Sequence, residues 1–158
     1  SGPLSIRAAL MWPEAKVTGI DYWGADFGYN QTMCEKNAAS EGVAARCRFQ
    51  HGDANKLDFP DESFDAVVSN YVYHNIKGKD KQQLLSETLR VLKKGGTFAI
   101  HDIMSPREYG DMRAFVKKLK ECGYEKVELV DTTDGLFLTK KESRAYMLAH
   151  SKLLVGKK

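Results

Sequence analysis

Short β-rich runs alternate with longer helical patterns along the chain, and this alternation is the feature that most constrains its fold. Strands separated by helices predict an α/β protein with a mainly parallel sheet. The expected helices cover residues 4–11, 29–41, 80–92, 109–122 and 139–148. The expected strands cover residues 16–21, 46–50, 64–69, 97–103, 126–130 and 153–155. Because only a short helix and loops separate the last two strands, we expect them to pair antiparallel near the C-terminal edge.

Local signals indicate how several of these elements begin, end and pack. Residues 64–69 form a nearly continuous apolar run, which is typical of a strand buried on both faces. Residues 80–92 carry an apolar stripe at helical spacing, and Gly95-Gly96 is expected to stop this helix. Thr139 and Glu142 form the sequence pattern of a capping box, which predicts the start of the last helix.

Length, charge and cysteine content exclude several classes of protein. The 158 residues suit a single domain spanning 1–158, and no apolar stretch approaches the ~18–20 residues of a membrane-spanning helix. The net charge is +3, and the basic pairs are scattered rather than gathered in the stripe typical of nucleic-acid binders. The three cysteines include no C-x-x-C pair, so neither a disulfide framework nor a metal site is indicated. We therefore expect a cytoplasmic protein with no metal, no nucleic-acid partner and no membrane partner.

Polar residues follow the expected strands at their carboxyl ends, where open α/β sheets bind ligands. They are Asp21-Tyr22, Gly52-Asp53-Ala54, Ser69-Asn70-Tyr71 and His101-Asp102. Asp21 follows Gly2 by 19 residues, and an acid at about this distance from a glycine turn can accept hydrogen bonds from both ribose hydroxyls. Taken alone, Asp21 also fits a helix cap and Asp53 a Gly-Asp turn. The aromatic residues after Asp21 are expected mainly to pack in the core or a lid: Tyr22, Trp23, Phe27 and Tyr29.

Four segments, taken in order, resemble the class I S-adenosylmethionine-dependent methyltransferases. They are Ser1-Gly2 with the helix and run 15–21 that follow, residues 51–54 with 57–65, residues 89–98, and Gly123-Tyr124 with the next β-run. Within the third segment, Lys93-Lys94 stands where the family usually has Lys-Pro. The resemblance covers nearly the whole chain. It implies a three-layer Rossmann-like fold and S-adenosyl-L-methionine as the cofactor.

The resemblance also implies roles for individual residues. Asp21 would hold the ribose hydroxyls, Asp53 would accept from the adenine amino group, and Tyr22 would pack against the adenine face. The other cofactor contacts would come from Gly2, the Ala54 backbone, Ser69 and Asn70, the last two near the methionyl end. A carboxylate suits a diol, an apolar slot suits a purine, and a glycine permits close backbone approach, so the residue types match these roles.

Methyl transfer from a sulfonium depends on alignment more than on acid catalysis, because the leaving group is already cationic. A base is needed only where the acceptor carries a proton that must leave. The candidates are His74 and Tyr71, which follow the strand 64–69. A histidine bonded only to structure is an equally good interpretation of His74. We expect His101 to be a packing histidine, and Asp102 either faces the site or serves a turn.

In this family the first strand and most of the glycine-rich turn precede the position that Ser1 matches, so we expect both upstream of this sequence. The family's sheet places that strand centrally, between the strands that end at Asp21 and Ser69. Without it, two apolar strand edges are expected to be unpaired, which favours self-association through them. For residues 1–158 alone we expect weak or absent cofactor affinity, and an inactive fragment is one interpretation.

Three interpretations of function stay open. The favoured one is a methyltransferase acting on a small molecule, since the chain has no basic stripe and no added recognition domain. The second is a protein or nucleic-acid methyltransferase, although Ser69-Asn70-Tyr71 lacks both prolines of the Asn-Pro-Pro-Tyr sites it faintly resembles. The third is a non-catalytic nucleotide-binding α/β module. Binding of NAD is disfavoured because Pro3-Leu4-Ser5 supplies no third glycine.

Overall fold

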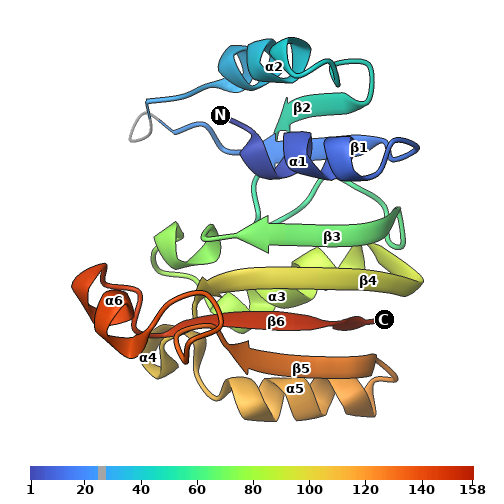
Figure 1. The fold of residues 1–158 in the computed structure, drawn as a ribbon. Coiled ribbons are helices and arrows are strands. Elements are labelled where there is room, and N and C mark those ends of the chain that lie inside the picture. The colour runs from blue at the N-terminus through green and yellow to red at the C-terminus, as the bar shows by residue number, and fades with distance from the viewer. Residues whose placement is uncertain (25–27) are drawn as a thin grey trace. The chain divides into compact units, whose positions relative to one another are not determined.

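The computed structural model describes residues 1–24 and 28–158, and the chain divides into two compact units, residues 1–58 and residues 59–158. Each unit has its own sheet flanked by helices, so the α/β class predicted from the alternating pattern is confirmed (Figure 1). Phe27, one of the aromatic residues expected to pack after Asp21, lies outside the described residues.

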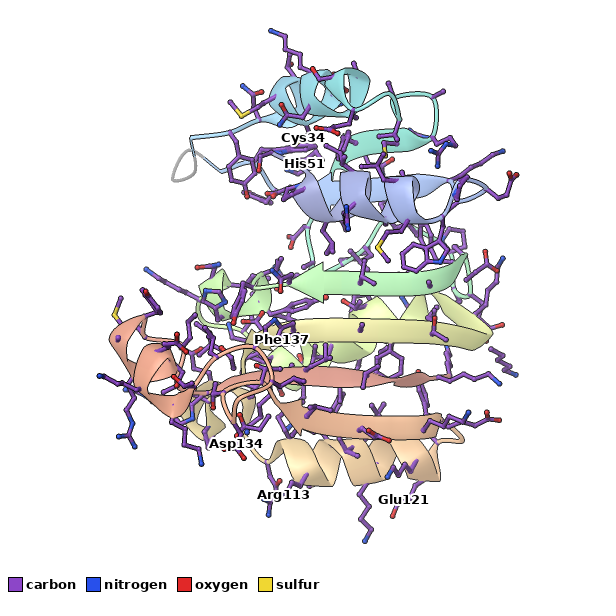
Figure 2. The ribbon with its side chains drawn as sticks, viewed as in Figure 1. Cys34, His51, Arg113, Glu121, Asp134 and Phe137 are labelled. Atoms are coloured by element: carbon purple, nitrogen blue, oxygen red, sulfur yellow. The ribbon has the colours of Figure 1, made fainter. Side chains whose placement is uncertain are left out.

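The first unit is built on two parallel strands. Its elements are α1 (Pro3–Met11), β1 (Val17–Asp21), α2 (Gln31–Ser40) and β2 (Cys47–His51). The strands pair in register from Val17 opposite Cys47 to Asp21 opposite His51, so their carboxyl ends lie at the same edge. Their buried core is shared between helices and sheet and consists of Ile6, Ala9, Cys34, Ala38, Val43, Cys47 and Phe49. Figure 2 labels Cys34 on α2 and His51 at the end of β2.

The second unit is a four-stranded mixed sheet in the order β3-β4-β6-β5 (Figure 1). Its elements are β3 (Phe64–Asn70), the 3₁₀ turn η1 (Tyr73–Asn75), α3 (Lys81–Arg90), β4 (Leu92–Ile103), α4 (Pro106–Tyr109), α5 (Met112–Glu121), β5 (Glu125–Asp131), α6 (Lys140–Ala145) and β6 (Ser151–Lys157). β3 and β4 are parallel, whereas β6 runs antiparallel to both β4 and β5. The antiparallel pairing predicted for the last two strands is therefore confirmed. So is the capping box, since the Thr139 hydroxyl accepts from the Glu142 backbone N–H and the Glu142 carboxylate accepts from the Thr139 N–H.

The strand β3 is not buried on both faces, which corrects the prediction from its apolar run. Ala66 is exposed and Val68 is 50% exposed. β3 is an edge strand, paired only with β4 among the described residues. Its apolar composition therefore predicted more burial than an edge position gives it. Likewise β1 pairs only with β2, and within the described residues no strand occupies the second edge of either β1 or β3. The expected upstream strand stays a prediction.

Two helix boundaries also differ from expectation. α3 ends at Arg90, and residues 93–96 lie inside β4, where a shift in register between Phe64 and Ala66 accommodates them. The predicted helix 109–122 is broken at Gly110, whose φ of 64° ends α4. Asp111 then begins α5 by accepting hydrogen bonds from the Arg113 and Ala114 backbone N–H groups, which favours a new helix over a continued one.

Gly96, which was expected to stop a helix, lies within β4 at a position too tightly packed for a side chain. A Cβ at this position would lie 2.6 Å from Leu92 Cδ1 and 2.8 Å from the Asp65 carbonyl oxygen. We expect Gly96→Ala to lower the free energy of unfolding by about 1–3 kcal/mol, because an extra methyl group in a packed region forces the backbone to shift. Urea denaturation followed by circular dichroism measures the change. Gly28→Ala is the control, because no atom of the described residues lies within 4 Å of its added Cβ, and an equal loss in both variants would contradict the packing argument.

Candidate functional site

The carboxylate of Asp21 ends β1 with one hydrogen bond on each oxygen. Oδ1 accepts from the Trp23 backbone N–H at 2.9 Å, and Oδ2 accepts from the Tyr29 hydroxyl at 3.0 Å. Burial and the Asp21 carboxylate raise the pKa of Tyr29, so this phenol stays a donor. Each carboxylate oxygen can accept a second hydrogen bond. Asp21 therefore offers the two acceptors that a vicinal diol requires.

Asp53 follows β2 at the same edge of the first sheet. The Gly52 backbone N–H donates to the Asp21 carbonyl oxygen at 3.0 Å, which ties the two strand ends together. The exposed Asp53 carboxylate accepts from the Asn55 backbone N–H at 2.8 Å and from the Asn55 side-chain amide. The structure thus brings the two predicted acids to the ends of neighbouring parallel strands, and Asp53 is also the turn-former that its Gly-Asp pair indicated.

The aromatic residues after Asp21 divide into two kinds. Tyr22 is 64% exposed, and its ring centroid lies 5.0 Å from that of His51, whose strand ends beside it. Trp23, by contrast, packs against the buried core of the first unit, and its indole N–H has no hydrogen-bond partner among the described residues. Tyr22 therefore presents an exposed aromatic ring, whereas Trp23 packs against the core, as expected for most of this group.

Gly2 has structural reasons to be a glycine apart from any ligand. It caps α1 with a φ of 71°, a conformation that favours glycine. An added Cβ would lie 2.8 Å from the Phe49 ring. The predicted approach of this turn to a cofactor stays a prediction, as does the role of the half-buried Ala54.

A second group of polar side chains lies at the carboxyl ends of β3 and β4, in the second unit. Asn70 is opposite His101 in the register, and its Oδ1 lies 3.0 Å from His101 Nδ1. His101 Nε2 lies 2.9 Å from Thr132 Oγ1. The ring centroid of Phe137, which Figure 2 labels, lies 6.0 Å from that of the same imidazole. His101 therefore packs within the sheet as expected, but both ring nitrogens have polar partners.

Burial lowers the pKa of His101, with the nearby Asp102 charge opposing the shift. The unfolded chain, with an ordinary histidine pKa of about 6.5, then binds more protons than the folded chain just below that pH. We expect the stabilising contribution to be complete above pH 6.5 and to be lost as the pH falls through the folded pKa. Thermal unfolding of His101→Gln across this window should show a shallower pH dependence than wild type. The exposed His150→Gln is the control, and an unchanged slope in His101→Gln would refute the assignment.

Tyr71 follows β3 in a strained conformation, with a φ of 53°. Its backbone N–H donates to the His101 carbonyl oxygen at 2.8 Å, and its hydroxyl lies 2.9 Å from Ser151 Oγ. The predicted base Tyr71 is thus held at the strand end by β4 and β6. Ser69, two residues earlier, is half-buried, and Asn70 is exposed.

His74 and Asp102 form the closest polar side-chain pair of this group, with 2.6 Å between His74 Nδ1 and Asp102 Oδ1. Asp102 is fully buried, whereas a quarter of the His74 side chain is exposed. Sequence reasoning named both residues but not the pairing. A usable signal exists, because Phe98, Ile100 and Asp102 alternate on the buried face of β4, and a charge on a buried strand face requires a partner.

Two kinds of feature are absent from the part of the chain that the structure describes. It contains no group of three or more His, Cys, Asp or Glu side chains placed to hold a metal ion. None of its helices combines the length and apolar character needed to cross a membrane.

Comparisons of the sequence with known proteins show the family to which the chain belongs. A family model described as "Methyltransferase domain" matches residues 2–100. The chain is 35% identical over 110 residues to the demethylmenaquinone methyltransferase of Listeria monocytogenes serotype 4a (strain HCC23), covering 70% of this chain but only 44% of that protein. The chain thus spans less than half the length of this relative.

Solved structures show the same fold at low identity. The cyclase SpnF matches with a TM-score of 0.69 and 17% identity, over 99% of this chain and 71% of SpnF. Geranyl diphosphate C-methyltransferase from Streptomyces coelicolor A3(2), solved with Mg²⁺, geranyl diphosphate and S-adenosyl-L-homocysteine, matches with a TM-score of 0.66 and 15% identity, over 96% of this chain and 67% of that chain. The shared fold hosts more than one chemistry, so function has to be argued from the site.

Proposed function

Because the chain belongs to the class I S-adenosylmethionine-dependent methyltransferase family, we propose that it serves methyl transfer from S-adenosylmethionine to a small-molecule acceptor. The observation that carries the proposal is the position of Asp21 and Asp53 at the carboxyl ends of two parallel strands, beside the exposed ring of Tyr22. A small-molecule acceptor is supported by the scattered basic residues and by the relative named as a demethylmenaquinone methyltransferase.

The proposed roles in the first unit follow from hydrogen-bonding capacity. The Asp21 oxygens accept from the two ribose hydroxyls, and Asp53 accepts from the adenine amino group. Tyr22 covers the adenine face, with the Ala54 backbone beside it. Each role uses an acceptor or a surface that the geometry of this unit offers, so these residues fit a nucleoside.

The proposed roles of the remaining residues concern the reacting end. Ser69, Asn70 and the Gly2 turn serve the methionyl part of the cofactor, and His74 and Tyr71 are the candidate bases. When bound, S-adenosylmethionine supplies an electrophilic methyl group on a sulfonium. The protein's own contribution is alignment, which is worth roughly 7–11 kcal/mol in favourable cases.

Titration with S-adenosylhomocysteine, followed by ¹⁵N NMR, tests the proposal and detects even millimolar affinity. We expect shifts to concentrate at Asp21, Tyr22, Gly52 and Asp53, and NAD to produce smaller ones. No change at these amides, in this chain and in a form extended upstream of Ser1 alike, would refute the proposal. Transfer of a labelled methyl group to a short-chain demethylmenaquinone is the first test of the acceptor class.

A further inference from the structure

We propose that Asp102 is the positioning residue of His74, and that it holds this imidazole with Nε2 as the base that takes a proton from the acceptor. This inference deepens the proposed function and rests on it. It also specifies the acceptor class, because only a nucleophile that carries a removable proton needs such a base, such as a hydroxyl, a thiol or an acidic C–H group.

The Asp102 carboxylate is fixed by four hydrogen bonds although it is fully buried. Oδ2 accepts from the Val72 backbone N–H at 3.1 Å and from the Tyr73 backbone N–H at 2.7 Å. Oδ1 accepts from its neighbour's backbone N–H, that of Ile103, at 2.7 Å and contacts His74 Nδ1 at 2.6 Å. The backbone donors all require an acceptor, so the carboxylate cannot turn away from the imidazole without leaving the buried Tyr73 N–H and two part-buried N–H groups unpaired.

This arrangement selects one tautomer of His74. An acceptor-only carboxylate 2.6 Å from Nδ1 requires that Nδ1 carry the proton and donate it. Nε2 then keeps its lone pair, and among the described residues Nε2 has no hydrogen-bond partner. The side chain is 25% exposed and follows β3 at the carboxyl end, where ligands bind in open α/β sheets.

Asp102 is the charged group in direct contact with His74. Burial raises the pKa of Tyr73 to about 12, with the Asp102 charge adding to the effect. Burial and Asp102 also raise the pKa of the fully buried Tyr109. The ring of Tyr71 meets that of His74 edge-on at 6.2 Å. Both buried phenols are therefore neutral near pH 7, and the anion that stabilises an imidazolium at His74 is Asp102.

The proton and electron balance of the step is simple. The acceptor atom gives its proton to Nε2 and uses the freed electron pair to bond the methyl carbon. The electron pair of the broken C–S bond stays on sulfur, and no oxidant or reductant is needed. The resulting imidazolium is stabilised by the Asp102 carboxylate and then releases its proton to water.

The tautomer of His74 is the measurement that tests the pairing. Histidine-ring ¹⁵N spectra of the wild-type chain are expected to show Nδ1 protonated and Nε2 bare. In Asp102→Asn the Nε2-protonated form should rise severalfold, because the remaining amide oxygen faces the Val72 and Tyr73 N–H groups and the amide NH₂, a donor, then faces Nδ1. The rate at which diethylpyrocarbonate modifies Nε2 of His74 should fall in proportion to the fraction of His74 whose Nε2 stays unprotonated. Asp134→Asn makes the same chemical change at an exposed site (Figure 2) and should change neither readout.

The outcomes separate this inference from the proposed function. A wild-type His74 protonated on Nε2 overturns the inference without any variant. The inference therefore stays testable even if Asp102→Asn does not fold. An unchanged tautomer in a folded Asp102→Asn also overturns it. Absent S-adenosylhomocysteine shifts, in this chain and in a form extended upstream of Ser1 alike, would refute the proposed function instead. A purely structural role for Asp102 would lower stability without selecting a tautomer.

Discussion

Asp21→Ala is expected to weaken S-adenosylhomocysteine binding at least tenfold. The side chain offers one acceptor to each of two ribose hydroxyls, and a hydrogen bond to a charged group is worth about 1.5–3 kcal/mol. Because about 1.4 kcal/mol corresponds to a factor of ten, the loss of even one such bond reaches the expected change. The dissociation constant from the ¹⁵N titration measures it.

Two comparison variants show whether the effect belongs to the carboxylate. Asp21→Asn keeps one acceptor oxygen and should give an intermediate affinity. Tyr29→Phe removes the hydroxyl that donates to Oδ2 but leaves both acceptors, so it should bind within about threefold of wild type. The exposed Asp58→Ala is the control for a lost charge. Wild-type affinity in Asp21→Ala would exclude the ribose assignment.

The first unit could be predicted well because its information is local. An apolar run ending in Asp21, a helix and a second short run define a parallel strand pair, and the register then follows from the pairing of Asp21 with His51. Parallel neighbouring strands place their carboxyl ends at the same edge, so the proximity of the strand ends at Asp21 and Asp53 could be predicted from the pattern alone.

The errors in the second unit come from tertiary context. Gly95-Gly96 has the composition of a helix stop, but the close packing of Leu92 and Asp65 around Gly96 requires a glycine within β4. The apolar stripe of 109–122 does not reveal that Gly110 adopts a positive φ and that Asp111 caps a separate helix. Local propensity is a weak prior where tertiary packing decides.

The polar pair of His74 and Asp102 could not be predicted from spacing, because 28 residues separate the two and only the β3–β4 pairing brings them together. The alternation along β4 gave a partial signal, since it places Asp102 on the face that carries Phe98 and Ile100. The alternation shows that Asp102 needs hydrogen-bond partners. It does not show that His74 and the two backbone N–H groups of the turn after β3 are those partners.

Phe98→Ala is expected to produce the largest loss of stability, about 3–5 kcal/mol, because it removes a large buried ring from a strand with neighbours on both sides. Phe98 is 2% exposed and is opposite Val67 of β3 and Gly156 of β6. A Cβ on Gly156 would lie 2.8 Å from the ring, so backbone and ring already pack closely. A cavity that the surrounding sheet fills only in part adds to the loss.

Urea unfolding measures this loss through two signals that report on different parts of the chain. Both tryptophans, Trp12 and Trp23, lie in residues 1–58, so fluorescence reports on the first unit, whereas circular dichroism reports on both. The dichroism transition should move to lower urea in Phe98→Ala. Phe137→Ala removes the same ring from a position that is 63% exposed and should change stability by no more than about 0.5 kcal/mol. A loss below about 1 kcal/mol for Phe98→Ala would mean that β4 does not form the packed centre of the second unit.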